Sequence, residues 1–248
     1  MTLQFTPLGV GDAFSTRHYS SSLLVSAQGT TLLIDCPHPI RKMMHEVAST
    51  QKPDLTDVDA VVLTHLHADH VSGLEGYLFF SRFLLGRKGT VAAHPLVLAD
   101  LWDHHLMAGM GRLNVDGRKE NFTLADYADT VPLDDTAEIS IGPFSIACRR
   151  TIHHIPTFAL RLTADGVTLA YSADTAYDPT LLTWLKDADL IIHETGKHIH
   201  TPYEKLTELP EADREKMRLI HFPDSFDPDA SDIECLVQGR RYTVSKSE

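Results

Sequence analysis

Three histidines and an aspartate are crowded into residues 64–70, directly after an apolar run at residues 60–63 that predicts a buried strand. Catalytic groups often lie on loops at strand ends, because a rigid sheet can hold and aim them. Imidazole and carboxylate suit zinc, and a purely structural loop has little reason to collect four such groups. The segment therefore predicts a metal site, with candidate ligands His65, His67, Asp69 and His70.

The remaining pattern predicts an α/β protein in which two sheets pack face to face with helices outside. Short β-type runs predict strands at 3–8, 22–25, 31–35, 60–63, 90–93, 138–141, 144–149, 158–163, 167–172, 190–193 and 218–221. Helices are expected at 39–47, 71–85, 95–105, 179–186 and 211–217. A length of 248 residues with 43% hydrophobic residues suits one domain over residues 1–248.

Two segments allow more than one interpretation. Residues 109–130 are polar and poorly patterned, which is typical of a lid or of an ordinary surface excursion. The apolar run at 77–85 is expected in the core, with a substrate wall or a dimer face as the alternative. Cys36, Cys148 and Cys235 are too far apart to indicate a disulfide framework, so we expect small buried side chains.

Charge and hydropathy exclude several classes of function. The net charge is −12, and an acidic protein without a local basic patch repels a phosphate backbone, so a long nucleic acid is not expected as a partner. A small anionic substrate remains compatible, because bound metals supply local positive charge. No apolar run approaches the roughly 18 residues of a membrane span, and the N-terminus does not resemble a signal peptide. A cytoplasmic location is therefore expected.

The motif at 65–70 resembles the H-x-H-x-D-H signature of the metallo-β-lactamase superfamily. Residues 150–157, Arg-Thr-Ile-His-His-Ile-Pro-Thr, resemble its H-x-(I/V)-P-(S/T) segment. Residues 171–175, Tyr-Ser-Ala-Asp-Thr, resemble (Y/F)-S-(G/A)-D-T, and residues 219–222, Leu-Ile-His-Phe, resemble its final L-x-H-(F/M) segment. The resemblance spans residues 8–221 and implies a four-layer αββα sandwich.

Two metal ions are implied by this resemblance, zinc in the first place, with manganese or iron as alternatives. The implied ligands are His65, His67 and His153 for one ion, Asp69, His70 and His221 for the other, and Asp174 as the bridge. His154 is the rival of His153. A hydroxide bridging the two ions would then be the nucleophile. Asp35 is expected either to orient a ligand histidine or merely to cap a turn, and Pro37 departs from the family's usual Asp-x-Gly.

The chain resembles most closely the branch of ribonuclease Z and related phosphodiesterases and arylsulfatases. Residues 8–14, Leu-Gly-Val-Gly-Asp-Ala-Phe, carry this likeness together with Asp-Thr at 174–175. Many zinc β-lactamases have Cys where this chain has Asp174, and oxygen-reducing relatives have Glu at the position of His67. We find no Gly/Pro-rich basic arm like the one with which ribonuclease Z binds transfer RNA, so a smaller phosphodiester is expected.

The segment His193-Glu194-Thr195 resembles the H-E-A-T segment of the same branch, and His200 follows it. This likeness implies that His200 protonates the leaving oxygen, since an alkoxide leaves poorly without a proton. Glu194 would orient it. The alternatives are an exposed histidine and a glutamate that caps the strand. The candidate catalytic residues are Asp69, Glu194 and His200.

The expected function is that of a dinuclear metal-dependent hydrolase, specifically a phosphodiesterase acting on a small phosphodiester. A lactonase, thioesterase, arylsulfatase or phosphotriesterase would use the same ligands, because pocket shape chooses among such substrates. A non-catalytic ligand-binding protein that retains the fold is the alternative of a different class. Such proteins usually lose ligands, and none of the expected ones is missing here. A homodimer is left open.

Overall fold

The computed structural model describes residues 2–47 and 53–246, whose strands form two large sheets and one separate hairpin. The first sheet has the strand order β15 (Tyr242–Thr243), β1 (Gln4–Gly9), β2 (Ser22–Ala27), β3 (Thr30–Ile34), β4 (Ala60–Val62), β5 (Gly89–Ala93), β8 (Ala128–Pro132). The second has the order β14 (Met217–Ile220), β13 (Leu190–Glu194), β12 (Val167–Tyr171), β11 (Phe158–Ala164), β10 (Phe144–Arg150), β9 (Ile139–Ile141).

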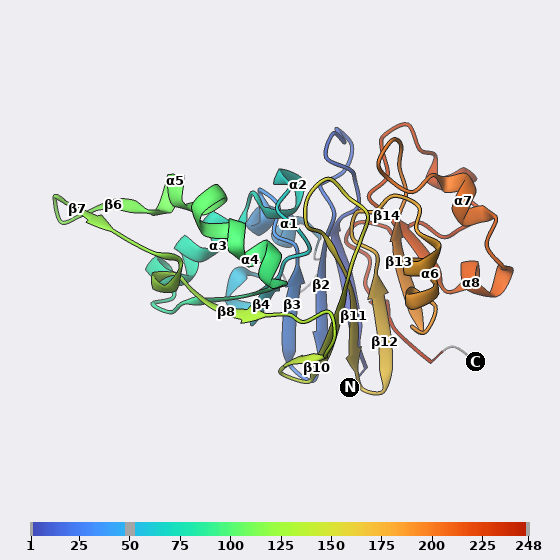
Figure 1. Ribbon diagram of the computed structural model, residues 1–248, viewed down its shortest axis with the longest axis horizontal. Coiled ribbons are helices and arrows are strands. Elements are labelled where there is room, and N and C mark those ends of the chain that lie inside the picture. The colour runs from blue at the N-terminus through green and yellow to red at the C-terminus, as the bar shows by residue number, and fades with distance from the viewer. Residues whose placement is uncertain (1, 48–52, 247–248) are drawn as a thin grey trace.

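Helices cover the outer sides of both sheets, as Figure 1 shows. On the side of the first sheet lie α1 (Ile40–Val47), α3 (Leu74–Phe79) and α4 (Pro95–Leu101), and on the side of the second lies α6 (Pro179–Leu185). The guanidinium of Arg161 on β11 lies 4.4 Å from the ring centre of Trp184 on α6, which joins that helix to its sheet. These four layers confirm the expected αββα sandwich.

Short turns with left-handed backbone connect the antiparallel strands. Gln28 and Gly29 have φ angles of 50° and 85° between β2 and β3, and Asp165 and Gly166 have 53° and 77° between β11 and β12. Two-residue turns of this kind match the natural twist of the flanking strands, and glycine at the second position carries no steric cost. The turn at residues 28–29 sets the register of β2 and β3, in which Ala27 pairs with Thr30.

Parallel neighbours bring several strand ends to one edge of the molecule. β3 pairs in parallel with β4, and β4 with β5, while β12, β13 and β14 are parallel in the second sheet. The carboxyl ends of parallel strands meet at the same edge of a sheet, where open α/β folds bind their ligands. The loops that follow these strands carry most of the candidate site residues.

The helix expected at residues 71–85 is interrupted. α2 (Ala68–Val71) ends before α3, and residues 80–84 form a π-helical turn. Tyr77 and Leu78 are buried as expected, but Phe83 and Leu84 are 58% and 69% exposed, so the second half of this run is not core. Hydrophobic periodicity alone could not predict that Phe83 and Leu84 are exposed, because the sheet covers only one side of the segment.

Residues 109–130 contain more regular structure than their sequence pattern indicates. After α5 (Met107–Met110) the chain forms a hairpin of β6 (Arg112–Val115) and β7 (Arg118–Asn121), and it then enters β8. Figure 1 shows this hairpin projecting from one end of the molecule. The segment therefore forms a surface excursion, one of the two expected alternatives, and its hairpin carries both basic and acidic side chains: Arg112, Asp116, Arg118, Lys119 and Glu120.

The two short helices α7 (Tyr203–Thr207) and α8 (Glu211–Glu215) precede β14, and only the second was expected from sequence. All three cysteines are buried and unpaired by disulfides, which confirms their expected role as small buried side chains. Over residues 2–47 and 53–246, every helix is too short or too polar to cross a bilayer.

We expect Leu160→Ala to lower the free energy of unfolding by about 2–5 kcal/mol, because it leaves a cavity in a close-packed interior. Leu160 is fully buried in β11 and is paired with Cys148 and Tyr171 on the neighbouring strands. Chemical denaturation measures the change. Ser140→Ala on the exposed face of β9 is the control and should change stability by less than about 0.5 kcal/mol. Equal effects of the two substitutions would contradict the core position of Leu160.

Candidate metal centre

The candidate ligands lie on loops that follow strands of both sheets. β4 leads into residues 64–70, β10 into His153, β12 into Asp174 and β14 into His221. Asp35 follows β3, Ala173 follows β12 and His221 follows β14. Their φ angles are 58°, 51° and 57°, so the chain turns sharply at the ends of these three strands. Non-glycine residues rarely adopt this conformation, and folded scaffolds retain such strain chiefly at functional sites.

His65, His67, His153 and Asp174 form a first group, whose ligand atoms all lie within 4.8 Å of one another. His67 Nδ1 is 3.1 Å from His65 Nε2 and 3.0 Å from His153 Nε2. Ligand atoms arranged tetrahedrally around zinc lie about 3.3 Å apart, so these three ring nitrogens have nearly the spacing of a zinc site. His154, the alternative to His153, is exposed and lies outside the group.

Asp69, His70, Asp174 and His221 form a second group within the same limit. Asp69 Oδ2 lies 3.3 Å from His70 Nε2 and 3.2 Å from His221 Nε2. Asp174 Oδ1 lies 3.3 Å from His70 Nε2, and its Oδ2 lies 3.7 Å from His153 Nε2. The carboxylate of Asp174 is therefore shared by the two groups, as a bridging ligand must be.

Several buried polar atoms of these groups make no hydrogen bond to any described residue. They are His70 Nε2, His153 Nδ1, Asp174 Oδ1 and His221 Nδ1. A buried polar atom left without a partner costs about 1–3 kcal/mol. His70 Nε2 and Asp174 Oδ1 in addition face each other across 3.3 Å. A divalent cation between them would satisfy both, so the donor set fits metal binding, with nitrogen and carboxylate ligands that zinc, manganese and iron accept.

Burial favours the neutral form of the histidines of the first group. It lowers the pKa of His65 well below the ordinary value, and the neighbouring His70 lowers it further. Burial also lowers the pKa of His67, and it lowers the pKa of His153 to about 4. A neutral imidazole keeps the lone pair that a metal ligand must offer.

Opposite charges balance one another in the second group. Burial lowers the pKa of His221, but the charge of Asp174 and a hydrogen bond with Asp69 outweigh it and raise the pKa to about 9. Burial raises the pKa of Asp174, yet the charges of His221 and His70 hold it well below its usual range. Without metal, protonated histidines thus compensate the buried carboxylates, and a bound dication would take over that charge.

Asp35 supports His70 from the side away from Asp174. Its carboxylate lies 2.8 Å from His70 Nδ1 and accepts hydrogen bonds of 2.8 Å from both the backbone N–H and the hydroxyl of Thr64. The same hydroxyl lies 2.9 Å from His65 Nδ1. Asp35 therefore contacts a candidate ligand directly and another through Thr64, a residue that sequence reasoning had not singled out. These contacts suit an orienting role.

His200 and Glu194 also come together beside the two groups. His200 Nδ1 lies 3.0 Å from Glu194 Oε1, which accepts a second hydrogen bond of 2.8 Å from the N–H of Thr175. The His200 ring centre is 5.0 Å from that of His221. Burial lowers the pKa of His200, but the hydrogen bond and charge of Glu194 raise it above the ordinary value. His200 is thus favoured in its protonated form.

A cavity of about 810 Å³ opens over the two groups, a size typical of sites for small ligands. None of its lining residues comes from the 109–130 segment. Residues outside the ligand motifs line its rim: Asp12, Ala13, Phe14, Lys197, His198, Ile199, Pro223 and Ser225. Of these, residues 12–14 belong to the segment that carried the family resemblance, but their place on the rim follows only from the folded chain.

We expect Asp35→Asn to weaken metal binding by about 10- to 100-fold, the usual effect of removing a partner behind a ligand. Asparagine tolerates the left-handed backbone of this position, so the substitution tests the carboxylate rather than the turn. Titration of the metal-free protein with Zn²⁺ measures the affinity. Asp59→Asn removes an exposed carboxylate that accepts a hydrogen bond from Thr31 N and is the matched control. If both variants bind zinc equally well, Asp35 only caps its turn.

The fold is shared with solved metallo-β-lactamase-fold structures. The protein YhfI from Bacillus subtilis, described as a metallo-β-lactamase fold protein, matches with a TM-score of 0.76 at 18% identity, over 98% of this chain and 100% of its own. A diphosphatase of the PhnP family matches with a TM-score of 0.70 at 15% identity, over 98% of both chains. Human tRNase Z, short form, matches with a TM-score of 0.69 at 17% identity, over 98% of this chain and 99% of its own.

Sequence relatives point to one family within this fold. The Anti-Pycsar protein Apyc1 of Bacillus phage 010DV004 is 30% identical over 261 residues, covering 98% of this chain and 99% of the relative. The protein of the same description from Paenibacillus xerothermodurans is 29% identical over 235 residues, covering 92% and 90%. The family model described as Anti-Pycsar protein Apyc1 matches residues 3–241. The chain therefore belongs to the Anti-Pycsar protein Apyc1 family and has the metallo-β-lactamase fold.

Proposed function

We propose that the chain is a metal-dependent hydrolase that cleaves a small phosphodiester. The observation that carries this proposal is the pair of ligand groups that share Asp174 at the floor of the cavity. Two metal ions in one site can clamp both the attacking and the leaving oxygen of a displacement at phosphorus.

In this proposal one ion is held by His65, His67, His153 and Asp174, and the other by Asp69, His70, His221 and Asp174. Zinc is the first candidate, because the histidine nitrogens already have nearly tetrahedral spacing. When bound, such ions polarise a phosphoryl oxygen and lower the pKa of water. The chain itself contributes the fixed positions of the ligands, and Asp35 holds the His70 ring in its orientation.

The cavity and the charge distribution favour a small anion as substrate. A volume of about 810 Å³ accommodates a single nucleotide. The net charge of −12 opposes binding of a polyanion, whereas Lys197 is exposed at the cavity rim and can attract one phosphate group. The similar folds include a diphosphatase of the PhnP family and human tRNase Z, which supports a phosphate-containing substrate.

His200 is proposed as the general acid of the reaction. Glu194 fixes its ring through the Nδ1 contact, which leaves Nε2 free to face the cavity that His200 lines. Glu194 also raises the pKa of His200 against the effect of burial, which favours the protonated form that a general acid needs.

The proposed function is tested with protein loaded with Zn²⁺ or Mn²⁺, using bis-(p-nitrophenyl) phosphate and 3′,5′-cyclic nucleotides as substrates. We expect turnover and two ions bound per chain. Asp174→Asn should lose one ion and more than about 100-fold in kcat/KM, because a shared ligand matters more than an outer partner. Asp178→Asn, at a helix cap outside the cavity, is the control. A fully loaded protein that cleaves esters or lactones but no phosphodiester contradicts the proposal.

For His200→Ala we expect an effect that depends on the leaving group. Hydrolysis of an ester with an alkoxide leaving group should slow by about 10²- to 10⁴-fold, because the general acid is lost. Release of p-nitrophenolate needs little protonation and should slow by less than about tenfold. Steady-state kinetics on both ester classes measure this, with exposed His104→Ala as the control. An equal loss on both classes would indicate that His200 only positions its neighbours.

A further inference from the structure

Phe14 is unusual among the aromatic residues because it is 89% exposed and yet lines the cavity above the two ligand groups. Leaving such a side chain in water forfeits the gain of about 1.5–3 kcal/mol that its burial would bring. No core contact of this chain explains its presence, because the described hydrophobic core does not include it. Its ring is instead available to whatever enters the cavity.

The turn that carries Phe14 is held by local contacts. The backbone N–H of Phe14 donates a 3.0 Å hydrogen bond to Asp12 Oδ1. Gly11 pairs with Ser20 and Phe222 through isolated bridges, and a side chain at Gly11 would clash with Ser15 at 2.6 Å. The turn is therefore folded tightly against its neighbours, and Phe14 is presented from a fixed backbone.

Asp224 ties this turn to the loop that follows His221. Its carboxylate accepts hydrogen bonds from the Ser15 hydroxyl at 2.5 Å and from the N–H and hydroxyl of Thr16 at 2.8 and 2.7 Å. The hydrogen bond from Ser15 lowers the pKa of Asp224, and those from Thr16 lower it further. Asp224 lies three residues after a candidate metal ligand, so these hydrogen bonds join the turn of Phe14 to a loop beside the ligand groups.

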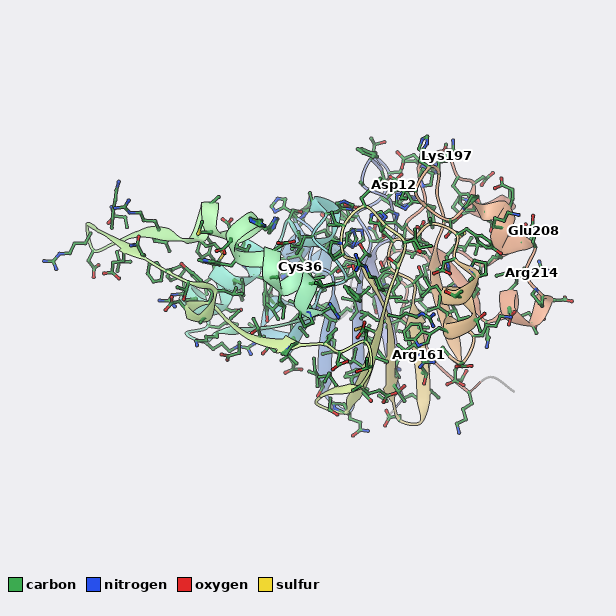
Figure 2. The ribbon with its side chains drawn as sticks, in the orientation of Figure 1. Asp12, Cys36, Arg161, Lys197, Glu208 and Arg214 are labelled. Carbon is green, nitrogen blue, oxygen red and sulfur yellow. The ribbon has the colours of Figure 1, made fainter. Side chains whose placement is uncertain are left out.

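Lys197 and Ile199 line the same cavity as Phe14. Figure 2 shows Asp12 and Lys197 at the same end of the molecule, on separate loops. The rim thus offers an exposed aromatic face at Phe14, an apolar side chain at Ile199 and a cation at Lys197. A planar, partly apolar group attached to a phosphate matches this combination better than an aliphatic ester does.

The geometry points to Phe14 as the platform on which the nucleobase of the substrate stacks while its phosphodiester lies at the ligand groups. This inference rests on the proposed phosphodiesterase function and adds the recognised group and the residue that recognises it. Stacking on an aromatic side chain accepts any base, because every base has a π face. A turn that is already ordered loses little conformational freedom on binding, so more of the stacking energy is retained.

The test uses metal-loaded protein with two cyclic phosphodiesters that differ in the base. One is a 3′,5′-cyclic nucleotide, and the other is trimethylene phosphate, a six-membered cyclic phosphodiester without a base, followed by turnover or as a competitive inhibitor. Phe14→Ala should raise the KM for the nucleotide by roughly 5- to 100-fold, the range for loss of one stacked base. kcat should change little, because stacking is equal in the ground and transition states. Trimethylene phosphate should be unaffected.

Further variants separate stacking from other roles. Phe14→Trp should keep the low KM, whereas Phe14→Leu, which is apolar but lacks a π face, should resemble Phe14→Ala. Phe83→Ala removes another exposed phenylalanine, which lies outside this cavity, and should leave all constants unchanged. Asp224→Ala should raise the KM for the nucleotide when it is the only substitution. It should raise this KM less in a protein that already carries Phe14→Ala, because Asp224 acts by holding the Phe14 ring in place.

Several outcomes overturn the inference. The first is an equal effect of Phe14→Ala on the KM for the nucleotide and for trimethylene phosphate. The second is a Phe14→Leu variant that behaves like the wild type. The third is a change of association state, measured by sedimentation, that accounts for the weaker binding of the nucleotide. If the wild type cleaves bis-(p-nitrophenyl) phosphate but no nucleotide, the proposed function holds and the stacking role of Phe14 is refuted. A wild type that is inactive on every phosphodiester refutes the proposed function itself, and the platform with it.

Discussion

The structure depends on the arrangement of buried charge around Asp174. Transferring a carboxylate into a protein interior costs several kcal/mol unless opposite charges and hydrogen bonds compensate it. His70 lies at Asp174 Oδ1 and His221 at Oδ2, and these two histidines provide that compensation. His65 and His153, whose pKa values are lowered by burial, also lie near Oδ2. Asp174 Oδ1 makes no hydrogen bond to a described residue, and His65 Nε2 lies only 3.1 Å from His67 Nδ1. These atoms are placed where a cation could bind them. The electrostatics of the fold therefore favour a cation at this site.

The scaffold makes this arrangement rigid by using strand ends from two sheets. Left-handed residues at 35, 173 and 221 turn the chain back toward one point. The Asp35–Thr64 contacts hold two candidate ligand histidines of the same loop, and Asp224 extends the fixed region to the cavity rim. Groups on rigid elements can be positioned closely enough for catalysis, whereas groups on free loops rarely are. A separate set of contacts, from Asp224 to Ser15 and Thr16, holds the turn that presents Phe14.

Sequence reasoning succeeded where the signal was local. The order of strands and helices along the chain followed from periodicity, and the four-layer architecture followed from the family resemblance. It failed at 71–85, where the interruption of the helix depends on what covers the segment. At 109–130 it predicted a lid or a surface excursion but not the hairpin within it. Residues 112–121 have weak alternation and mixed charge, so their pairing has no strong sequence signature. Phe14, Thr64 and Lys197 were not recognised as parts of the site, because exposure and distance are not local properties.

The sequence by itself determined the kinds of ligand and their order along the chain, because H-x-H-x-D-H and the later His and Asp segments are chemical properties of the residues. It also determined an acidic, metal-binding character. Only the tertiary structure decided between His153 and His154 as the residue nearest the first group, and only it placed Asp174 between the two groups. Only it showed that Asp35 reaches His70. The physical reason is that such choices depend on distances between segments far apart in the chain, which strand pairing and side-chain packing set together.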